Sequence, residues 1–365
     1  MAIKKIGIDA RLLAQTGVGV YIKNLLYELS GILQPSYQLV LYIRPQDQHL
    51  LPQLPSNTIL RHTKAHWHSL AEQTLLLKQL LVDNLDLMHF CYFSMPILYN
   101  RPFVITIHDM IPYKHPTGRA STKNSLTYTF KHYMYKKVLL HAVQHAKKVF
   151  VPTNAVKQDM LTIFPALDHD RIVRTYEGVD KELIHATPTK PRLLLKSPYV
   201  LYMGNYYPHK QVEFLIDAYD KSSLQMPLVL CGPGDYFAQR IDRYIARKKS
   251  RQSILRLSNL TLGERAYVYA HARALVHPSK DEGFGLPLVE ATYFGCPVIA
   301  SDIPVFREVC AQATFFTTYS TNELTLHLNK LTGSTNAKKK YALLDKKFSF
   351  HTMAQETYNQ YVKLL

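Results

Sequence analysis

The stretch VHPSKDEGFGLPLVEATYFGCPVIAS, residues 276–301, contains the pattern from which the fold of this chain can be inferred. An apolar run ends at its first residue and a second apolar run, 297–300, lies near its end, so two strands are predicted. The polar residues between them predict a loop and then a helix that begins near Pro287. Proline is tolerated in the first turn of a helix, because the N–H groups of that turn have no partner inside the helix. The stretch therefore predicts a strand, loop, helix and strand in succession, as in an α/β protein.

The loop in this stretch has the composition of an anion site. Gly283 and Gly285 allow close approach to the backbone, and the N–H groups at a helix start favour phosphate or another anion. Two carboxylates, Glu282 and Glu290, are eight residues apart, which is about 12 Å along a helix. Acidic side chains beside an anion are expected to bind hydroxyl groups. We therefore expect a ribose at one of them and a sugar at the other.

The spacing Glu282…Glu290, in EGFGLPLVE followed by GCPVIASDIP, resembles the signature of the retaining, nucleotide-sugar-dependent glycosyltransferases of family 4. Two glutamates at this spacing also occur on solvated helices, but the EGFG, LP and GCPV residues favour the family signature. The resemblance extends along nearly the whole chain. It implies the α/β GT-B fold, with two Rossmann-like domains facing a cleft and a C-terminal helix that crosses back to the N-terminal domain.

The length of 365 residues suits two domains, each with its own core. We expect an N-terminal Rossmann-like, acceptor-binding domain at 1–185 and a nucleotide-sugar-binding Rossmann-like domain at 198–348. The helix at 349–365 is expected to pack on the N-terminal domain. The stretch 181–198 has three prolines and is the expected linker.

Composition narrows the function classes. The formal net charge of +17 implies an anionic partner, whether nucleic acid, anionic lipid or pyrophosphate. No apolar run approaches the roughly 20 residues of a membrane span, and no signal peptide precedes the first strand, so a cytoplasmic protein is expected. The four cysteines have no metal-ligand spacing and are expected to be reduced core residues.

Two glycines, Gly17 and Gly19, follow the first predicted strand, Ile3 to Ile8, and precede a helix from about Val20 to Leu29. This is a phosphate-loop arrangement, although a pair of glycines alone is a weak signal and the third glycine of a dehydrogenase is absent. The stretch GIDARLL…TGVGVYIKNLL resembles the first loop of the family 4 enzymes. The resemblance implies that this loop closes over the reaction centre and contacts donor phosphate or acceptor.

His108 follows a predicted strand, Val104 to Ile107, and ligands of open α/β sheets bind at the carboxyl ends of strands. The stretch HDMIPYKHP resembles the family motif in which the histidine approaches the transferred sugar, and a buried, hydrogen-bonded histidine is the alternative. Trp67 lies in a segment that also resembles the family. For Trp67 a packing role is favoured over a role facing the acceptor.

The loop after the strand Tyr199 to Met203 resembles the diphosphate loop of the family. Lys210 opens a helix there, so its ammonium and the helix dipole could both stabilise a diphosphate. The family usually has an arginine directly after the glycine, whereas this chain has Asn205, which weakens the expected diphosphate site unless His209 or another base substitutes. Some mannosyltransferase-like members also lack the arginine, which favours GDP-mannose as donor and leaves a UDP-sugar open.

The region 114–157 is strongly basic: no Asp or Glu occurs from Met110 to Gln158. Interleaved aromatic residues suit an anionic membrane surface, with a solvated basic surface as the alternative. The segment 126–149 does not divide into two helical faces, so a break in it is expected. Nine basic residues lie here: Lys114, Arg119, Lys123, Lys131, Lys136, Lys137, Lys147, Lys148 and Lys157.

The expected chemistry is hexose transfer from a nucleotide sugar to a cell-envelope or lipid-linked glycan without a metal or other cofactor, and the resemblance implies retention at the anomeric carbon. The triplet 168–170, DHD, lies in a turn and is not expected to hold a metal. The charge favours a peripheral position on the inner face of the plasma membrane. The resemblance implies catalytic positions at His108 and Glu282 and donor-binding positions at Gly17, Gly19, Asn205, Lys210, Phe284, Gly285, Leu286 and Glu290.

Two other classes of function remain open from the sequence. One is a basic protein that binds nucleic acid or another polyanion, although no zinc spacing, RNA-binding signature or helix-turn-helix pattern accompanies the charge, so nucleic acid is not expected as a partner. The other is a nucleotide-sugar epimerase or hydrolase with the GT-B fold, which would need an added general acid or base.

Overall fold

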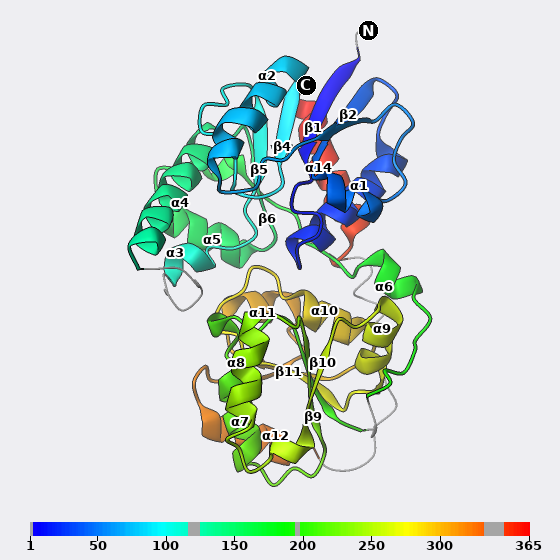
Figure 1. Cartoon of the computed structure of the whole chain (residues 1–365), viewed down its shortest axis with the longest axis vertical. Coiled ribbons are helices and arrows are strands. Elements are labelled where there is room, and N and C mark those ends of the chain that lie inside the picture. Colours follow the sequence, from blue (N-terminus) through cyan, green and yellow to red (C-terminus); the bar gives the residue numbers. More distant parts are fainter. Residues whose placement is uncertain (1–2, 116–124, 194–197, 332–346) are drawn as a thin grey trace. The chain divides into compact units, whose positions relative to one another are not determined.

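The computed structural model describes residues 3–115, 125–193, 198–331 and 347–365, without the side chains of 125–128, 130 and 131. The chain forms two compact units: an N-terminal unit of Met1–Gly178 and Phe348–Leu365, and a C-terminal unit of Val179–Lys347 (Figure 1). The segment 179–185, which the sequence placed in the first domain, is thus grouped with the C-terminal unit. Its helix α6 (Lys181–His185) packs on α9 (Leu262–His271).

The N-terminal unit is built on a seven-stranded parallel sheet with the strand order β3-β2-β1-β4-β5-β6-β7. Its central strands are apolar runs buried on both faces, as expected for a parallel sheet with helices on either side. Ile6 of β1 is in register with Leu39 of β2 on one side and Leu87 of β4 on the other. The strands are β1 (Lys4–Asp9), β2 (Tyr37–Ile43), β3 (Ile59–His62), β4 (Leu87–Phe90), β5 (Phe103–Thr106), β6 (Val149–Val151) and β7 (Ile172–Arg174).

Helices of the N-terminal unit begin where the sequence provides a cap. The Thr153 hydroxyl accepts a hydrogen bond from the Val156 N–H at the start of α5. The break expected within 126–149 is wrong: α4 is one helix, because the segment has no proline or glycine to interrupt it. The helices are α1 (Val18–Ile32), η1 (Pro45–Leu50), η2 (Glu72–Leu76), α2 (Leu77–Asp83), α3 (Ile111–Lys114), α4 (Ser125–His145), α5 (Asn154–Ile163), η4 (His169–Arg171) and α14 (Phe350–Leu364).

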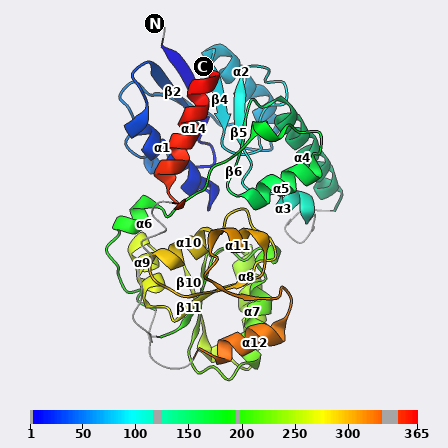
Figure 2. The same ribbon diagram turned by 180° about the vertical axis from the view of Figure 1, so that it is seen from behind.

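The C-terminal helix α14 returns to the N-terminal unit, as predicted, and lies beside α1 (Figure 2). Its Tyr361 hydroxyl is hydrogen-bonded to Nδ1 of the buried His89 on β4, and His89 Nε2 is 2.7 Å from the Thr106 hydroxyl on β5. Tyr21 of α1 also bonds Thr106, at 3.0 Å. Burial lowers the pKa of His89 to about 3, helped by the charge of His108, so the ring is neutral at pH 7.

The chain leaves the N-terminal unit and re-enters it at one place. Gly178 lies so close to the returning segment that an added Cβ would be 2.7 Å from the Phe348 carbonyl oxygen. The Tyr176 and Phe348 rings form an edge contact with centroids 5.2 Å apart. The outgoing and returning segments are therefore packed against each other.

The C-terminal unit contains a six-stranded parallel sheet with the order β10-β9-β8-β11-β12-β13. Its buried central strand β11 has β8 on one side and β12 on the other. The strands are β8 (Val200–Met203), β9 (Leu228–Gly232), β10 (Ile254–Ser258), β11 (Ala274–His277), β12 (Val298–Ser301) and β13 (Thr314–Phe316). Besides α6 and α9, the helices are η5 (Pro208–Lys210), α7 (Val212–Lys221), α8 (Tyr236–Ile245), η6 (Arg251–Ser253), α10 (Leu286–Tyr293), α11 (Pro304–Val309) and α12 (Thr321–Asn329).

Several smaller predictions can be scored. The four cysteines are buried and none forms a disulfide with another described residue, as predicted. The 168–170 triplet is an exposed turn in which the Asp168 carboxylate accepts a hydrogen bond from the Asp170 N–H, also as predicted. Within the described ranges, no helix combines the length and the apolar character that crossing a bilayer requires.

Candidate functional site

The loop that joins β11 to α10 forms the centre of the candidate site. Gly285 caps α10 with φ of 91°, and an added Cβ there would lie 2.9 Å from the Phe306 ring, so glycine suits both the backbone and the space. Pro287 occupies the first turn, as predicted. The loop is joined to the segment after β8 because the Lys280 N–H donates to the His209 carbonyl oxygen at 2.9 Å.

Glu282 lies at the centre of this loop and binds three donors with a single oxygen. Its Oε1 accepts hydrogen bonds from Lys210 Nζ at 2.5 Å, Ser279 Oγ at 2.7 Å and His277 Nε2 at 3.3 Å. Oε2 accepts no hydrogen bond from any described residue, while Glu282 as a whole keeps 8% of its surface exposed. Burial alone would raise the pKa of this carboxyl, but Lys210 and His277 outweigh it and hold the pKa well below its usual range. The cluster therefore presents an ionised carboxylate with one oxygen available.

His277, the last residue of β11, fixes the position of this carboxylate. It is fully buried, with ring centroids 5.5 Å from those of both Tyr202 and Phe306. A carboxylate oxygen can only accept, so Nε2 is the protonated nitrogen. Nδ1 is buried without a hydrogen-bond partner among the described residues. Burial lowers the pKa of His277, although Glu282 opposes the shift, so the ring is neutral at pH 7.

The segment after β8 positions Asn205 and Lys210 beside the loop. The Tyr202 hydroxyl donates to the Asn205 carbonyl oxygen at 2.5 Å, and the Asn205 side chain accepts from the Tyr207 N–H at 3.4 Å. Asn205 thus stabilises its own turn. His209 precedes Lys210 in η5, and its charge also lowers the pKa of Glu282, after the larger effects of Lys210 and His277.

Glu290, on α10, has a separate set of partners. Both its oxygens accept from Arg265 Nη2, at 2.9 and 3.0 Å, and Oε2 also accepts from the Tyr269 hydroxyl at 2.6 Å. Its side chain is only 2% exposed, whereas that of Arg265 is 25% exposed. Glu290 raises the pKa of Arg265, and this effect is larger than the lowering by burial. The sequence analysis did not identify Arg265 or Tyr269, which come from α9.

His108 lies in the N-terminal unit with both ring nitrogens next to acceptors. Nδ1 is 3.2 Å from the Glu177 carboxylate and Nε2 is 3.0 Å from the Cys91 carbonyl oxygen. The Tyr21 and His108 rings lie nearly perpendicular to each other, with centroids 4.8 Å apart. The side chain is 11% exposed. The two alternatives for His108 were a ring that approaches the sugar and a buried, hydrogen-bonded ring. The ring is largely buried and hydrogen-bonded, and part of its surface is still accessible.

Gly17 and Gly19 lie at the start of α1, where Gly17 is the N-cap. An added Cβ on Gly19 would be 2.3 Å from the Leu13 carbonyl oxygen, so packing alone explains that glycine. Beneath this loop the fully buried Arg11 pairs with Asp9 at 2.7 Å and with Glu72 at 2.9 Å. These three residues, the Arg11 cluster, connect the end of β1 to η2.

The predicted site residues divide between the two units. Lys210 and Glu282 are in direct contact, whereas Glu282 and Glu290 have different partners. Phe284 is buried and Leu286 half-buried at the start of α10. The C-terminal unit contains Asn205, Lys210, Glu282, Phe284, Gly285, Leu286 and Glu290, and the N-terminal unit contains Gly17, Gly19 and His108.

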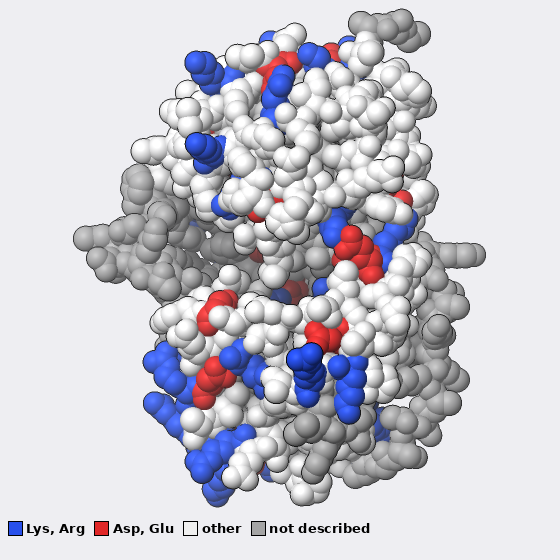
Figure 3. All heavy atoms as spheres, turned by 45° about the vertical axis from the view of Figure 1, so that its right-hand side comes forward, with Lys and Arg blue, Asp and Glu red and all other residues white. Residues whose placement is uncertain are grey.

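Much of the basic region 114–157 is engaged with protein groups. Lys114 pairs with Asp159 at 2.8 Å, while Lys148 and Lys157 donate to backbone carbonyl oxygens. The predicted contributions of Arg119, Lys123 and the Lys131 side chain lie outside the described residues. Figure 3 shows that Lys and Arg also gather on one face of the C-terminal unit. In the described part of the chain, no three His, Cys, Asp or Glu residues form a group that could hold a metal ion.

Two family models match the chain in succession. Residues 16–183 match the model described as Glycosyltransferase Family 4, and residues 186–342 match the model described as Glycosyl transferases group 1. The chain is 29% identical to the O-antigen chain mannosyltransferase RfbU of Salmonella typhimurium over 225 residues, which are 61% of this chain and 58% of that protein. It is 28% identical over 226 residues to the O-antigen chain mannosyltransferase B of Escherichia coli, covering 58% and 55%. The alignments thus span somewhat more than half of each relative.

Solved structures share the whole fold. Anabaena Alr3699/HepE, crystallised with UDP and glucose, superposes with a TM-score of 0.74 at 17% identity, covering 99% of this chain and 100% of that one. WaaG, a glycosyltransferase involved in lipopolysaccharide biosynthesis, superposes with a TM-score of 0.67 at 14% identity, covering 97% and 94%. The two Rossmann-like units are therefore those of the GT-B fold, as the sequence predicted.

Proposed function

The chain belongs to glycosyltransferase family 4, and on that premise we propose that it transfers a hexose from a nucleotide sugar to a cell-envelope or lipid-linked glycan. Mannose from GDP-mannose is the favoured donor, and a UDP-sugar is the alternative. The similarity to two O-antigen chain mannosyltransferases supports mannose. Asn205 occupies the position where the family usually has an arginine, and this also supports mannose.

The observation that best supports this proposal is the unequal use of the two Glu282 oxygens. Three donors occupy Oε1, so the carboxylate cannot rotate without losing them, and Oε2 retains its capacity to accept. An ionised carboxylate with one available oxygen suits a sugar hydroxyl, which can donate to it. Glu282 would in this way orient the transferred hexose.

The diphosphate would bind next to this carboxylate. The Lys210 ammonium has three N–H donors and uses one for Glu282, so it can also contact a phosphate oxygen. The N-terminal end of α10, at Phe284, Gly285 and Leu286, adds N–H groups that favour an anion. His209 is the base nearest in sequence to replace the arginine missing at Asn205.

Glu290 would bind the ribose. Its Oε1 has one donor, from Arg265, and can accept a second hydrogen bond. Because the carboxylate is nearly buried and Arg265 is a quarter exposed, the ribose would approach along the guanidinium. Arg265 would then orient Glu290 without being the ligand itself.

These groups match the charge that develops during transfer. Departure of the leaving group builds negative charge on the β-phosphate, where Lys210 and the start of α10 would stabilise it. Fixed dipoles and a lysine would make a metal unnecessary. The family premise implies retention, with the acceptor attacking from the leaving-group face. Neither Glu282, tied at one oxygen, nor His108, with both nitrogens next to protein acceptors, is assigned as a nucleophile.

The acceptor side of the proposal includes an anionic membrane surface. Lys136 and Lys137 lie over the rings of Tyr113 and Tyr133, at 4.8 and 5.5 Å, which combines basic and aromatic groups on α3 and α4. Such a surface suits a peripheral position on the inner face of the plasma membrane. Binding to anionic liposomes that falls with salt is the expected result, and equal binding to neutral liposomes would contradict it.

The test of the proposed function is thermal stabilisation by GDP, UDP, ADP and dTDP, with a Glu290→Gln variant as comparison. A nucleotide at 100 times its dissociation constant should stabilise the protein by about 2.7 kcal/mol, and the variant should lose most of this. Product analysis with the matching sugar nucleotide then separates transfer from epimerisation or hydrolysis. If no nucleotide stabilises the protein while nucleic acid does so in a salt-dependent way, the proposal is wrong.

A further inference from the structure

A chain of four hydrogen-bonded side chains crosses the core of the N-terminal unit, and none of the four is an expected donor-binding or catalytic residue. The Tyr361 hydroxyl bonds His89 Nδ1, and His89 Nε2 is 2.7 Å from the Thr106 hydroxyl. The Thr106 hydroxyl is in turn 3.0 Å from that of Tyr21. None of these residues is more than 2% exposed. We call them the His89 network: Tyr361 on α14, His89 on β4, Thr106 on β5 and Tyr21 on α1.

The His89 network is hydrogen-bonded without any charge. Because burial keeps the His89 ring neutral, one of its nitrogens donates a hydrogen bond and the other accepts one. Burial also raises the pKa of the Tyr21 and Tyr361 hydroxyls, so both stay protonated at pH 7. A hydroxyl can donate or accept, so all three hydrogen bonds form with either tautomer of His89. Removing one hydroxyl takes a hydrogen bond from its buried neighbour, which is costly in a core.

One end of the network lies against His108. The Tyr21 and His108 rings are in edge contact at an interplanar angle of 81°, an arrangement that aromatic rings prefer. Thr106 fixes the hydroxyl end of Tyr21, so the Tyr21 ring forms a fixed wall beside the histidine. The charge of His108 also helps to lower the pKa of His89, after the larger effect of burial, so the two histidines interact across this short distance.

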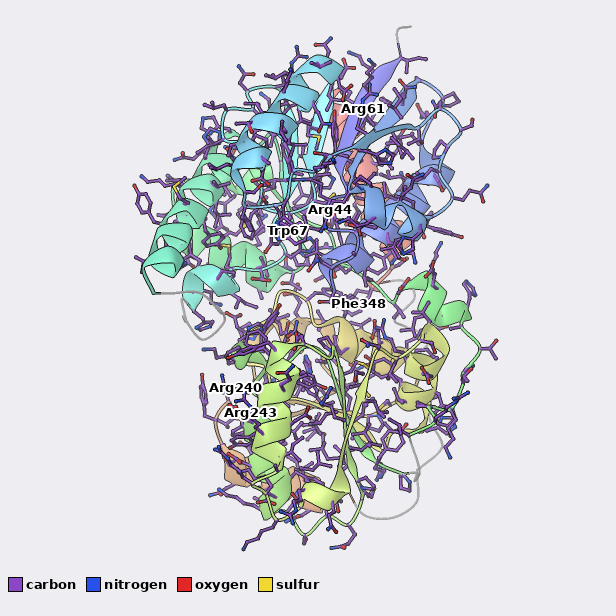
Figure 4. The ribbon with its side chains drawn as sticks, viewed as in Figure 1. Arg44, Arg61, Trp67, Arg240, Arg243 and Phe348 are labelled. Atoms are coloured by element: carbon purple, nitrogen blue, oxygen red, sulfur yellow. The ribbon has the colours of Figure 1, made fainter. Side chains whose placement is uncertain are left out.

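A second connection runs from His108 to the start of α14. His108 Nδ1 is 3.2 Å from the Glu177 carboxylate, and the next residue, Gly178, packs on the returning chain. An added Cβ on Gly178 would be 2.7 Å from both the Phe348 carbonyl oxygen and the Phe350 nitrogen. Phe348, labelled in Figure 4, begins the returning segment, and Phe350 is the first residue of α14.

The two connections thus join His108 to one helix at two separate points. Tyr361 lies about 16 Å along α14 from its first residue. We propose that α14 positions His108 for the transfer reaction, through the His89 network at its last turn and through the Gly178 contact at its start. The members of the network are positioning residues, because they act through His108 and are buried. The reaction that His108 serves rests on the proposed function, whereas its coupling to α14 does not.

The coupling can be measured without a substrate. Long-range ¹H–¹⁵N spectra report on histidine ring nitrogens, and the signal of His108 is identified by its loss in His108→Gln. Tyr361→Phe removes one hydroxyl of the network and keeps the ring, so the His108 signal should shift. Tyr358→Phe is the matched control on the same helix, because the Tyr358 hydroxyl also accepts a hydrogen bond, from the Gln34 N–H at 3.3 Å. It lies outside the network and should leave the His108 signal in place.

Turnover then tests whether the position of His108 matters for the reaction. The probe is GDP-mannose, or UDP-glucose if UDP is the stabilising nucleotide, with methyl α-mannoside as acceptor and nucleotide release as the signal. Tyr361→Phe and Thr106→Val should lower kcat by about tenfold, because a small displacement near the reacting atoms is enough for such a loss. KM for the donor should be unchanged, since the proposed diphosphate and ribose contacts lie in the C-terminal unit. Thr106→Ser keeps the hydroxyl and should retain the wild-type kcat.

Thermal unfolding shows whether each variant is folded. Trp67, the only tryptophan, belongs to the N-terminal unit and lies beside Arg44, whose guanidinium is 5.5 Å from the indole centroid (Figure 4). Its fluorescence therefore follows this unit. Tyr21→Phe removes the hydroxyl at the opposite end of the network and keeps the ring beside His108. It should reproduce the effects of Tyr361→Phe, and it tests the proposal if Tyr361→Phe does not fold.

The outcomes separate this inference from the proposed function. If the folded network variants leave the His108 signal or kcat as Tyr358→Phe leaves them, α14 does not position His108. Equal losses of kcat in Tyr358→Phe and Tyr361→Phe would also contradict the inference, because they would show a general response of the helix. No nucleotide release and no stabilisation by a nucleoside diphosphate would contradict the proposed function, whereas the His108 signal would still decide on the coupling to α14.

Discussion

The Arg11 cluster and the Glu282 cluster are both buried groups of charges near the carboxyl end of a strand, yet they differ in how completely they are hydrogen-bonded. In the Arg11 cluster, all four carboxylate oxygens of Asp9 and Glu72 accept hydrogen bonds. In the Glu282 cluster, one oxygen has three donors and the other has none among the described residues. Buried charge alone therefore does not identify a functional site. The unused capacity to accept a hydrogen bond distinguishes the two clusters.

If the Arg11 cluster is only a support, removing its cation should affect stability most. Arg11→Leu leaves two buried carboxylates without their cation, so the free energy of unfolding should fall by about 3–5 kcal/mol. Denaturant unfolding followed by Trp67 fluorescence reports on this unit. Lys4→Met, which removes a half-exposed lysine paired with Asp86, is the control and should cost at most about 1 kcal/mol. Equal losses would show that burial of the ion pair does not matter here.

If the Glu282 cluster is a site, Glu282→Gln should affect function instead. The amide keeps the shape but loses the charge, and sugar transfer should fall by about 10²–10³-fold. Affinity for a nucleoside diphosphate should hold or rise, because Lys210 is released and a negative charge is removed. Product formation and thermal stabilisation by nucleotide measure the two effects. If product formation and nucleotide stabilisation were lost together, Glu282 would have a structural role like that of Arg11.

A third test uses the buried His89 network, which is another fully hydrogen-bonded group. The folded-state pKa of His89 is lowered to about 3, so the unfolded chain takes up a proton below pH 6.5 while the folded protein does not. The stability is present above pH 6.5 and is lost as the pH falls, by about 2 kcal/mol at pH 5. His89→Gln should flatten this dependence in denaturant titrations, and His66→Gln, an exposed control, should not.

The smallest expected effect concerns Ser279, one of the three hydrogen-bond donors in the Glu282 cluster. Ser279→Ala removes one of the three hydrogen bonds to Glu282 Oε1 and leaves Lys210 and His277 in place. Transfer should slow by about tenfold, equivalent to about 1.4 kcal/mol, with little change in nucleotide affinity. Ser301, buried at the end of β12 with a hydroxyl that has no partner among the described residues, is the matched control for a serine-to-alanine change. A tenfold effect from Ser301→Ala would show that the assay responds to packing alone.

Local signals in the sequence predicted most of the elements that position these clusters. Pro287 and the glycines around Glu282 marked the start of α10. These features depend on backbone chemistry within a few residues, which a sequence displays directly. The return of α14 to the N-terminal unit followed from the family resemblance.

The partners of the charged residues could not be predicted in the same way. Glu290 pairs with Arg265 and Glu72 with Arg11, across 25 and 61 positions, and nothing local shows which of 44 basic residues each carboxylate meets. His277 and Ser279 are exceptions, since they lie within five residues of Glu282 on the same strand and loop. The polar residues that immediately precede the EGFG stretch were an available signal that the sequence analysis did not use.

The close packing of Gly178 against Phe348 has an evolutionary consequence. The C-terminal unit is an insertion into the N-terminal unit, and the two ends of the insertion leave and re-enter at neighbouring positions. A recombination event with junctions at these two positions would replace the inserted unit and keep every strand of the seven-stranded sheet. Chimaeras joined there would exchange one Rossmann-like unit as a module, and the specificity that each unit encodes could be inherited separately.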